Sequence, residues 1–533
     1  MKDIGYEKKL EKLGAFEISS SMLKIAKNND KNNTILNAGR GNPNWINTQS
    51  RLAFVRLMQW GVEESKRTIN YENMAGYTEK EGIYDRFCNY IINEDEVDEF
   101  IRKTIRYCVE ELKLEKDDLI KELTDGIIGN NYPVPSRCLK NTEVILNDFL
   151  QSSLYRDVDL KNETLVFPVE GGTAAMCYIL NSLQHNGLVN KGDKIAINTP
   201  IFTPYIQIPR LTGFSMVEIN LRSKEENGWC IEPEQIDKLL DPEIKAFFIV
   251  NPSNPASQAI SDEILERLKK IIEKRKDLII VTDDVYGTFV DGFKTIYSVA
   301  PQNTILVYSF SKLYGVTGWR TGLIAMNKNN VCDRLIQELP EQKKKDLIYD
   351  YSIVTTEPEK MPFIDRMCAD SRNIGLYHTS GLSTPQQIFM ALMSLTHTVS
   401  KDNDRYIEKS KEIVSSRYHD LFKTLGLHEN NSKNNAKYYS LINIYDIAEK
   451  VYDKKFSEWM KKNFEEIDFL TRLSSKNGAV LMGGVGFCAE NGTVRVSQAN
   501  LPDEDYKELA ERILNILEGY HKEYMKINSE KNE

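Results

Sequence analysis

The sequence contains no apolar run that approaches the roughly 18 residues a transmembrane helix needs, so a membrane-spanning protein is not expected. Residues 1–21 carry charges without an apolar core or a small-residue cleavage site, so they do not resemble a secretory signal. Basic residues are not in excess, because 69 lysines and arginines face 78 aspartates and glutamates. A nucleic-acid binder normally carries a basic face. We therefore expect neither a membrane nor a nucleic acid as a partner.

Paired cysteines are also missing. The eight cysteines are spread along the 533 residues, and no two of them have the CxxC spacing of a zinc site or a redox motif. Scattered cysteines in a chain of this size are most often reduced and buried. This pattern predicts a cytoplasmic protein without a metal site.

The sequence does contain short apolar runs that alternate with amphipathic stretches. The runs are 194–198, 246–250, 278–282, 304–308 and 321–326, and a helical stretch at 260–275 separates two of them. Near-continuous apolar strands that alternate with such helices are typical of an α/β domain with a mostly parallel sheet. Outside this region we expect a helix over 7–27, a short strand over 34–40 and a strand over 493–498.

A lysine directly follows one of these runs. Lys312 lies in SFSKLYGVTGWR, after the run 304–308, and would therefore stand at the carboxyl end of a strand, where open α/β sheets bind ligands. Such a lysine can form a Schiff base with an aldehyde cofactor when desolvation or nearby positive charge lowers its pKa. Arg320 and the glycines of the segment would allow close approach of a phosphate. For this segment alone, a solvated lysine in a turn is an equal alternative.

Two further segments also follow apolar runs. Asp283, in VTDDVY, could pair with a pyridinium nitrogen and keep it protonated, or it could simply cap the next helix. Asn254, in NPSNP, could hydrogen-bond a ring hydroxyl, although Asn-Pro is also common in turns. A short glycine loop, Glu170-Gly171-Gly172-Thr173, opens a helix whose backbone N–H groups could bind a phosphate. None of these segments is specific by itself.

Taken together, the order and spacing of SFSKLYGVTGWR, NPSNP, DDVY and EGGT resemble the aspartate aminotransferase superfamily, the fold type I enzymes that use pyridoxal 5'-phosphate (PLP). The resemblance spans about 35 to 500. It implies an α/β fold with a mostly parallel seven-stranded sheet in the large domain and a smaller α+β domain built from both termini. The implied units are 1–75 (N-terminal segment and part of the small domain), 76–375 (PLP-binding domain with helical insertions near 90–160 and 330–375) and 376–533 (C-terminal small domain).

The resemblance also assigns roles to the motif residues. Lys312 would be the Schiff-base lysine, and Asp283 would be the partner of the pyridine nitrogen. Asn254 and Tyr286 would bind the ring hydroxyl oxygen, and Lys312, Asp283 and Tyr286 are the expected catalytic residues. The phosphate would be held by Gly171, Gly172, Thr173, Ser309 and Arg320.

Three positions outside these motifs match family residues as well. Phe202, in TPIFTPY, stands where the family stacks an aromatic ring on the cofactor. Arg495, in TVRVSQAN, matches the arginine that clamps the substrate α-carboxylate, with Asn254 beside it. Tyr71, in INYENMAG, resembles the tyrosine that reaches the phosphate of the neighbouring subunit. This implies a homodimer, and the insertions suggest assembly into larger oligomers.

The insertions and the segment LNAGRGNPNW narrow the resemblance to the bifunctional aspartate aminotransferase/aspartate 4-decarboxylases. Arg40, together with Gly41, would bind the distal carboxylate of the substrate; a surface arginine in a glycine turn is the alternative. The implied reaction is β-decarboxylation of L-aspartate to L-alanine and CO2, with amino transfer to a 2-oxo acid as a side activity. A simple aspartate aminotransferase without decarboxylation is the alternative function.

One segment departs from the decarboxylase pattern. The resembling enzymes carry a lysine in an FELK-like N-terminal segment, whereas this chain reads Phe16-Glu17-Ile18-Ser19. If that lysine places the substrate, its replacement by Ser19 puts decarboxylation in doubt more than transamination. His378 lies in a segment that could line the substrate pocket; a hydrogen-bonded structural role is the alternative.

Overall fold

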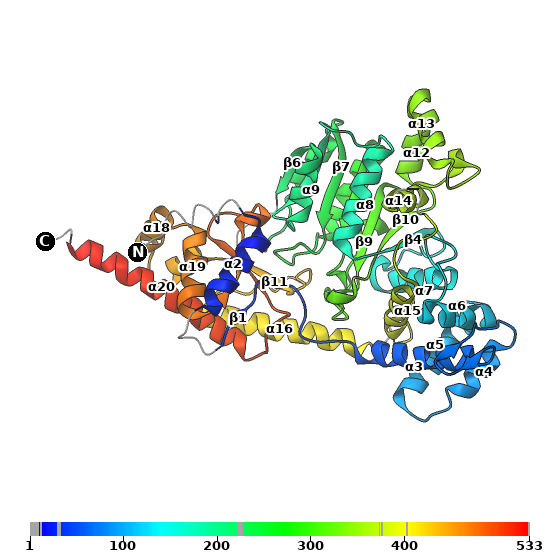
Figure 1. The fold of residues 1–533 in the computed structure, drawn as a ribbon. Coiled ribbons are helices and arrows are strands. Elements are labelled where there is room, and N and C mark those ends of the chain that lie inside the picture. The colour runs from blue at the N-terminus through cyan, green and yellow to red at the C-terminus, as the bar shows by residue number, and fades with distance from the viewer. Residues whose placement is uncertain are drawn as a thin grey trace.

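The computed structural model describes residues 10, 13–28, 34–220, 228–372, 374, 377–400 and 403–530. Figure 1 shows a sheet-containing domain in the middle, a smaller domain that contains the C-terminal helix on one side, and a group of helices on the other. Within the described ranges, no helix is long and apolar enough to cross a membrane.

A seven-stranded sheet forms the centre of the large domain. From edge to edge its strands are β4 (Thr164–Val169), β10 (Gly322–Asn327), β9 (Thr304–Ser309), β8 (Ile279–Asp283), β7 (Ile244–Val250), β5 (Lys194–Thr199) and β6 (Ser215–Asn220). Neighbours from β9 to β6 pair in parallel, and β10 is antiparallel to both β9 and β4. The prediction of an α/β fold with a mostly parallel seven-stranded sheet is therefore confirmed.

The sheet is covered on both faces, which explains why its central strands are apolar throughout. Along β7, Phe248 points into the cluster that contains Ile179, whereas Phe247 points into the cluster that contains Leu268. Ile179 belongs to α8 (Gly172–His185) and Leu268 to α11 (Asp262–Lys274), so these two helices lie on opposite faces. The other helices of this part are α9 (Pro204–Thr212) and the short α10 (Pro233–Ile236).

The two edge strands are the ones that the apolar runs do not predict. β4 contains Pro168, which has no N–H to donate, and its sole strand partner among the described residues is β10. Proline argues against a central strand and is tolerated at an edge. β6 has the mixed sequence SMVEIN and pairs with β5 alone within the same ranges, so it does not need a continuous apolar run.

The small domain combines both ends of the chain, as expected. Its strands are β11 (Tyr439–Asn443), β14 (Thr493–Ser497) and β13 (Met482–Gly483), with β1 (Leu36–Asn37) parallel to β12 (Ala479–Val480). Its helices are α2 (Ala15–Lys27), α16 (Arg405–Leu425), α17 (Ile444–Val451), α18 (Lys454–Asn463), α19 (Glu466–Asn477) and α20 (Asp505–Glu530). In Figure 1 the blue α2 lies against the orange α19.

The helix predicted over 7–27 is interrupted, because Leu10 is helical but Leu13 and Gly14 are not. Gly14 is the N-cap of α2, so the helix begins at Ala15, and its buried residues Met22 and Ala26 pack into the core of the small domain. Residues 7–9, 11 and 12 lie outside the described residues. Glycine at this position interrupts the helical run because it has the lowest helix propensity apart from proline.

A helical subdomain occupies the region before the sheet. It consists of α3 (Thr48–Ser65), α4 (Ile83–Tyr90), α5 (Glu96–Glu110), α6 (Lys116–Ile128) and α7 (Lys140–Leu150), which continues into the π-helical turn η1 (Gln151–Tyr155). A small hairpin, β2 (Asn70–Tyr71) and β3 (Met74–Ala75), connects α3 to α4. These helices have a hydrophobic core of their own, centred on Trp60 and Phe87, and α15 (Thr384–Thr398) contributes Ile388 to it.

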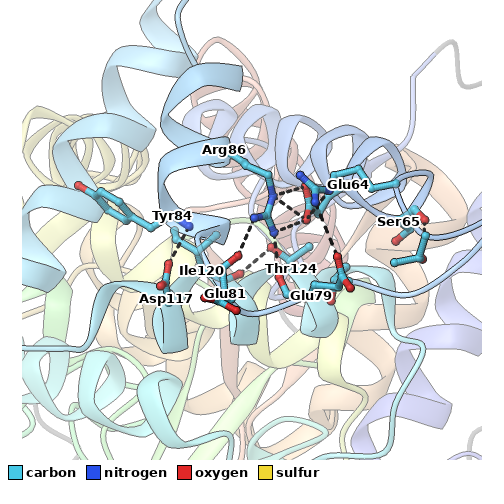
Figure 2. Close-up of polar contacts among 12 residues, drawn as sticks. Glu64, Ser65, Glu79, Glu81, Tyr84, Arg86, Asp117, Ile120 and Thr124 are labelled. Atoms are coloured by element: carbon cyan, nitrogen blue, oxygen red, sulfur yellow. Dashed lines mark hydrogen bonds and ion pairs between the residues drawn. The ribbon is translucent and has the colours of Figure 1, made fainter.

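A buried ion pair joins this hairpin region to the helices. Arg86 of α4 donates hydrogen bonds to both carboxylate oxygens of Glu64 on α3, at 2.6 to 3.1 Å. The same guanidinium donates to the backbone carbonyls of Glu79 and Glu81, just after the hairpin. Figure 2 shows Arg86 pointing between these groups. Glu64 is only 3% exposed, so its charge is stabilised mainly by this arginine, while Arg67 Nε lies farther away at 3.7 Å.

Replacing Arg86 with methionine is expected to lower the free energy of unfolding by about 2–3 kcal/mol, because Glu64 would keep a buried charge without its bidentate partner. The denaturant midpoint of the variant measures this. The matched control is Lys66→Met, which breaks the exposed pair with Glu63 and should cost under about 1 kcal/mol. Equal costs for the two variants would contradict the prediction.

The insertion predicted near 330–375 forms α12 (Val331–Gln337), α13 (Glu341–Tyr351) and α14 (Phe363–Ser371). Asp370 of α14 accepts hydrogen bonds from Ser182 at 2.6 Å and from Tyr351 at 2.8 Å, and it lies 2.8 Å from the ring of His185. Hydrogen bonding to Asp370, partly opposed by burial, raises the pKa of His185. Ser182 and His185 belong to α8, so these hydrogen bonds connect α14 to the helix that begins at the glycine loop.

Candidate active site

The polar residues that follow the apolar strands meet in one cavity. It has a volume of about 240 Å³ and lies at the carboxyl ends of β7, β8 and β9, where the small domain contributes its own side chains. Among the predicted site residues, those that line it are Gly41, Gly172, Thr173, Phe202, Asn254, Asp283, Tyr286, Ser309, Lys312, Arg320 and Arg495.

Asp283 is the last residue of β8 and is buried at the floor of the cavity. Tyr205 donates a hydrogen bond to its Oδ2 at 2.9 Å, and the Val285 N–H donates to its Oδ1 at 3.3 Å. Burial raises the pKa of Asp283 to about 6, although these two hydrogen bonds and the charge of Lys312 oppose the rise. A cationic ring nitrogen would relieve the cost of ionising this carboxyl, so Asp283 fits the pyridinium of PLP.

Lys312 lies on the loop after β9, as its position in the sequence predicts. Its Nζ donates to the carbonyl of Gly41 at 3.2 Å, so the amine points into the cavity toward the small-domain side. This contact also shows why residue 41 is a glycine. A Cβ built there would lie 2.0 Å from the hydroxyl of Tyr439 and 3.3 Å from Lys312 Nζ.

A cradle for an anion lies at the start of α8. Gly171 is the N-cap of this helix with φ 91°, and a Cβ at this position would lie 2.5 Å from Nη2 of Arg320. Arg320 donates to the carbonyls of Glu170 and Thr317 and forms no ion pair with a described residue. The hydroxyl of Ser309 donates to Ser311 within the same pocket. Helix N–H groups, an arginine and hydroxyls form a suitable site for a phosphate.

Arg495, on β14, closes the cavity from the small domain. It is 2% exposed, and its Nη1 donates to Asn254 Oδ1 at 2.9 Å while Nη2 donates to the Gly39 carbonyl at 2.7 Å. Its Nε has no hydrogen-bond partner, and none of the described carboxylates forms an ion pair with it. A buried guanidinium with an unused donor can bind a substrate carboxylate.

Two tyrosines and the asparagine connect these groups. Asn254 Nδ2 donates to the hydroxyl of Tyr286 at 3.3 Å, and Tyr286 donates to the hydroxyl of Tyr439 at 3.2 Å. Phe202 stands at the cavity wall with its ring edge-to-face against Phe16, at 5.9 Å between centroids. The apolar wall and the polar groups opposite it can hold a flat aromatic ring with polar substituents.

Four candidate site residues do not line the cavity. Gly171 lies just behind it, in contact with Arg320. Arg40 is exposed next to Gly41, so its side chain is not part of the cavity in this subunit. Tyr71 is 67% exposed on the hairpin strand β2. His378 is also outside the cavity and is hydrogen-bonded to Ser136 at 2.9 Å, as its structural interpretation predicts.

Some cavity residues were not identified from the sequence. Phe16 and Tyr439 line the cavity, and Tyr205 contacts Asp283 from α9. Tyr439 is the first residue of β11, which pairs with the strand of Arg495. The motif TVRVSQ marks that strand, so a search for its partner strand could have found Tyr439. Ser19, which replaces the lysine of the FELK-like segment, has its hydroxyl 3.0 Å from a Cβ built on Gly39.

The chain matches the model of the aminotransferase class I and II family over residues 146–513. This chain belongs to that family. A bifunctional aspartate aminotransferase and L-aspartate beta-decarboxylase from a Pseudomonas species is 39% identical over 526 residues, which cover 98% of this chain and 99% of that protein. An aspartate/prephenate aminotransferase from Nitrosomonas europaea is 31% identical over 140 residues, which cover 25% of this chain and 35% of that protein.

Solved structures of aminotransferases have the same fold. An aspartate aminotransferase from Thermus thermophilus, solved with maleate, superposes with a TM-score of 0.59 at 17% identity, covering 97% of this chain and 100% of the other. An aromatic aminotransferase from Pyrococcus horikoshii gives a TM-score of 0.56 at 18% identity, covering 94% and 99% of the two chains. The cofactor of this aminotransferase family is PLP, and the cavity fits it: the buried Asp283 can pair with a ring nitrogen, and the start of α8 with Arg320 can bind a phosphate.

Proposed function

We propose that the chain is a PLP-dependent L-aspartate β-decarboxylase that forms L-alanine and CO2 and also transfers the amino group of aspartate to a 2-oxo acid. The observation that carries this is the similarity to the Pseudomonas enzyme along almost the whole of both chains, with the insertions included. The cavity supports it, because the buried Arg495 can bind one carboxylate and Gly41, the neighbour of Arg40 in the chain, lines the cavity wall. The exposed Arg40 would turn toward the cavity to bind the second carboxylate of the substrate.

Each residue has a task in this reaction. Lys312 would hold the cofactor aldehyde and, once released, move the proton of the substrate α-carbon. Asp283 would keep the ring nitrogen protonated, while Asn254 and Tyr286 would position the ring through its hydroxyl oxygen. Phe202 would pack on the ring. When bound, PLP supplies the electron sink that both amino transfer and loss of CO2 require.

The phosphate and the substrate would be held by separate groups. Gly171, Gly172, Thr173, Ser309 and Arg320 would bind the phosphate. Arg495 would clamp the α-carboxylate beside Asn254, and Arg40 with Gly41 would contact the distal carboxylate. The balance between decarboxylation and amino transfer depends on how tightly the distal carboxylate is held. A strong ion pair stabilises this carboxylate and opposes its loss as CO2.

The decisive experiment follows alanine and CO2 together from purified protein, PLP and L-aspartate. Only trace 2-oxo acid is added, to return any cofactor left in its amine form. Many turnovers of alanine matched by CO2 are expected. Oxaloacetate formed in step with added 2-oxoglutarate, and no alanine, would instead identify the simple aminotransferase. In that case Ser19, beside Gly39 in place of a lysine, would be the first position to change.

A homodimer is part of the proposal. Along α3, the apolar side chains Leu52, Val55 and Val62 are 41–53% exposed and lie on one face of the helix by their spacing. The nearby hairpin adds Tyr71 and Met74, which are 67% and 58% exposed. A contiguous exposed apolar surface is typical of a subunit interface. A second copy on this surface would bring Tyr71 toward a neighbouring phosphate cradle, and larger assemblies of dimers are compatible with it.

Val55→Asp is expected to dissociate this dimer, because a carboxylate would be buried without a partner at the interface. Sedimentation velocity at low micromolar protein should show the dimer mass for the wild type and the monomer mass for the variant. Val451→Asp is the matched control, since Val451 is 45% exposed on α17 of the small domain. A variant that remains dimeric would exclude this face as the interface.

A cytoplasmic location is also part of the proposal. All eight cysteines lie within the described residues, and none of them forms a disulfide. Free thiols in several buried positions are typical of proteins from reducing compartments.

A further inference from the structure

Tyr439 occupies a central position among the charged groups of the cavity. Its hydroxyl accepts a hydrogen bond from Tyr286 at 3.2 Å, and the Arg495 guanidinium lies 4.2 Å from the centre of its ring. The Lys312 amine and the Tyr439 hydroxyl both lie beside Gly41, at 3.3 Å and 2.0 Å from a Cβ built there. Tyr439 is 2% exposed, and its backbone N–H is fixed by the hydroxyl of Ser257 at 2.7 Å.

This environment makes Tyr439 a better proton-transfer group than an ordinary tyrosine. Burial alone would raise the pKa of its phenol, but the charges of Lys312 and Arg495 and the hydrogen bond from Tyr286 together lower it. The neighbouring Tyr286 behaves in the opposite way, because burial and the proximity of Tyr439 raise its pKa. A tyrosine whose pKa is lowered can lose and regain a proton more readily, which suits it to acid–base chemistry.

The groups that would hold the substrate place its β-carbon near this hydroxyl. The α-carboxylate would lie on Arg495, and the α-carbon would lie within reach of Lys312. A side chain that extends toward Gly41 must then pass Tyr439, whose hydroxyl is the atom closest to a Cβ built on that glycine. The hydroxyl of the adjacent Tyr438 donates to the Gly41 carbonyl at 2.9 Å, so its proton is already used in a hydrogen bond.

We propose that Tyr439 is a catalytic acid, which donates a proton to the β-carbon of the substrate after CO2 has left. This inference rests on the proposed decarboxylation. The bond between the β-carbon and the carboxylate carbon breaks, and the electron pair remains with the substrate. A C–H bond then forms with the proton of the Tyr439 hydroxyl. The phenolate regains a proton from solvent, directly or through Lys312, so one proton is consumed for each CO2 released.

The first test compares two reactions of the same Tyr439→Phe holoenzyme. Formation of alanine from aspartate is expected to fall by about 100-fold or more, as for loss of a general acid, whereas formation of oxaloacetate with 2-oxoglutarate should change by less than about 5-fold. An equal fall in both reactions would overturn the proposal and indicate a structural role. A wild type that forms no alanine would refute the decarboxylase function itself, which separates the two failures.

The second test reads the phenol directly and needs no turnover. In an ultraviolet titration of the full chain without PLP, the wild type should show a tyrosine that ionises below the bulk of the 26 tyrosines. This early step should be absent from Tyr439→Phe and retained in Tyr349→Phe, whose side chain is 81% exposed and lies outside the cavity. Titration curves that coincide for wild type and Tyr439→Phe would overturn the proposal.

The pH profile provides a further readout of the same residue. Because the protonated phenol is the donor, alanine formation should decline as the pH rises through the pKa of Tyr439 in the wild type. In Tyr439→Phe this decline should disappear along with most of the activity. A decline that persists unchanged in the variant would assign it to another group and contradict the proposal.

Discussion

Replacing Lys312 with alanine is expected to reduce both alanine and oxaloacetate formation by at least about 10³-fold, because in the proposed function this one residue supplies the covalent attachment and the α-carbon proton transfer. The variant should also lose the visible absorption of lysine-bound PLP, since no other lysine side chain lines the cavity within the described residues. Steady-state rates and the absorption spectrum of the dialysed protein measure the two effects.

Lys328→Ala is the matched control for this experiment. Lys328 follows β10, which runs antiparallel to β9, so it lies at the opposite edge of the sheet and donates to the Asn162 carbonyl. The control should keep the activity and the spectrum of the wild type. If Lys312→Ala retained more than about a tenth of the wild-type rate, Lys312 would not be the attachment residue.

The second large effect is expected for Asp283→Asn. An amide cannot hold the ring nitrogen protonated as a carboxylate does, so the rate should fall by at least about 10³-fold in both reactions. PLP should still bind, because the phosphate cradle at Gly171 and Arg320 is untouched. Rates at saturating PLP separate this effect from weaker cofactor binding.

The same substitution should stabilise the protein when PLP is absent. Burial raises the pKa of Asp283 from its ordinary 3.8 to about 6, so the stability that the neutral carboxyl contributes is present below pH 3.8 and is lost as the pH rises through 6. At pH 7 the asparagine avoids this loss, and we expect a gain of about 3 kcal/mol. The gain should fade as the pH falls toward 4.

Asp291→Asn provides the comparison, since the Asp291 side chain is 85% exposed and should change neither stability nor rate by much. A cofactor-free Asp283→Asn protein that is less stable than the wild type at pH 7 would contradict the expected cost of the buried carboxylate. Stability given up for activity at a single residue is common in enzyme active sites.

The large domain, and the site residues that it contributes, could be predicted from the sequence because both depend on local patterns. Lys312, Asp283 and Asn254 each come directly after an apolar strand, and parallel strands bring their carboxyl ends to one edge. The edge strand β4 was not predicted because Pro168 interrupts its apolar pattern. The helix predicted over 7–27 is interrupted before Ala15, because Gly14 is the N-cap of α2.

The other half of the site depends on contacts between distant segments. Tyr439 reaches the cavity because β11 pairs with β14 in a register that sets Leu441 opposite Arg495, and no local pattern encodes this pairing. Phe16 faces Phe202 only after α2 has packed onto the C-terminal part. The roles given to Arg40 and Tyr71 stay predictions, since both side chains lie outside the cavity of the single subunit.

The pairing of β1 with β12 has a consequence for biosynthesis. Leu36 leaves the ribosome hundreds of residues before its partner Ala479 is synthesised. At roughly 5–20 residues per second, α2 waits for on the order of half a minute with Met22 and Ala26 uncovered. The nascent chain therefore cannot complete its PLP pocket before Arg495 is synthesised. Chaperone binding to the waiting N-terminal segment, and sensitivity of soluble yield to tags placed there, are expected from this order of events.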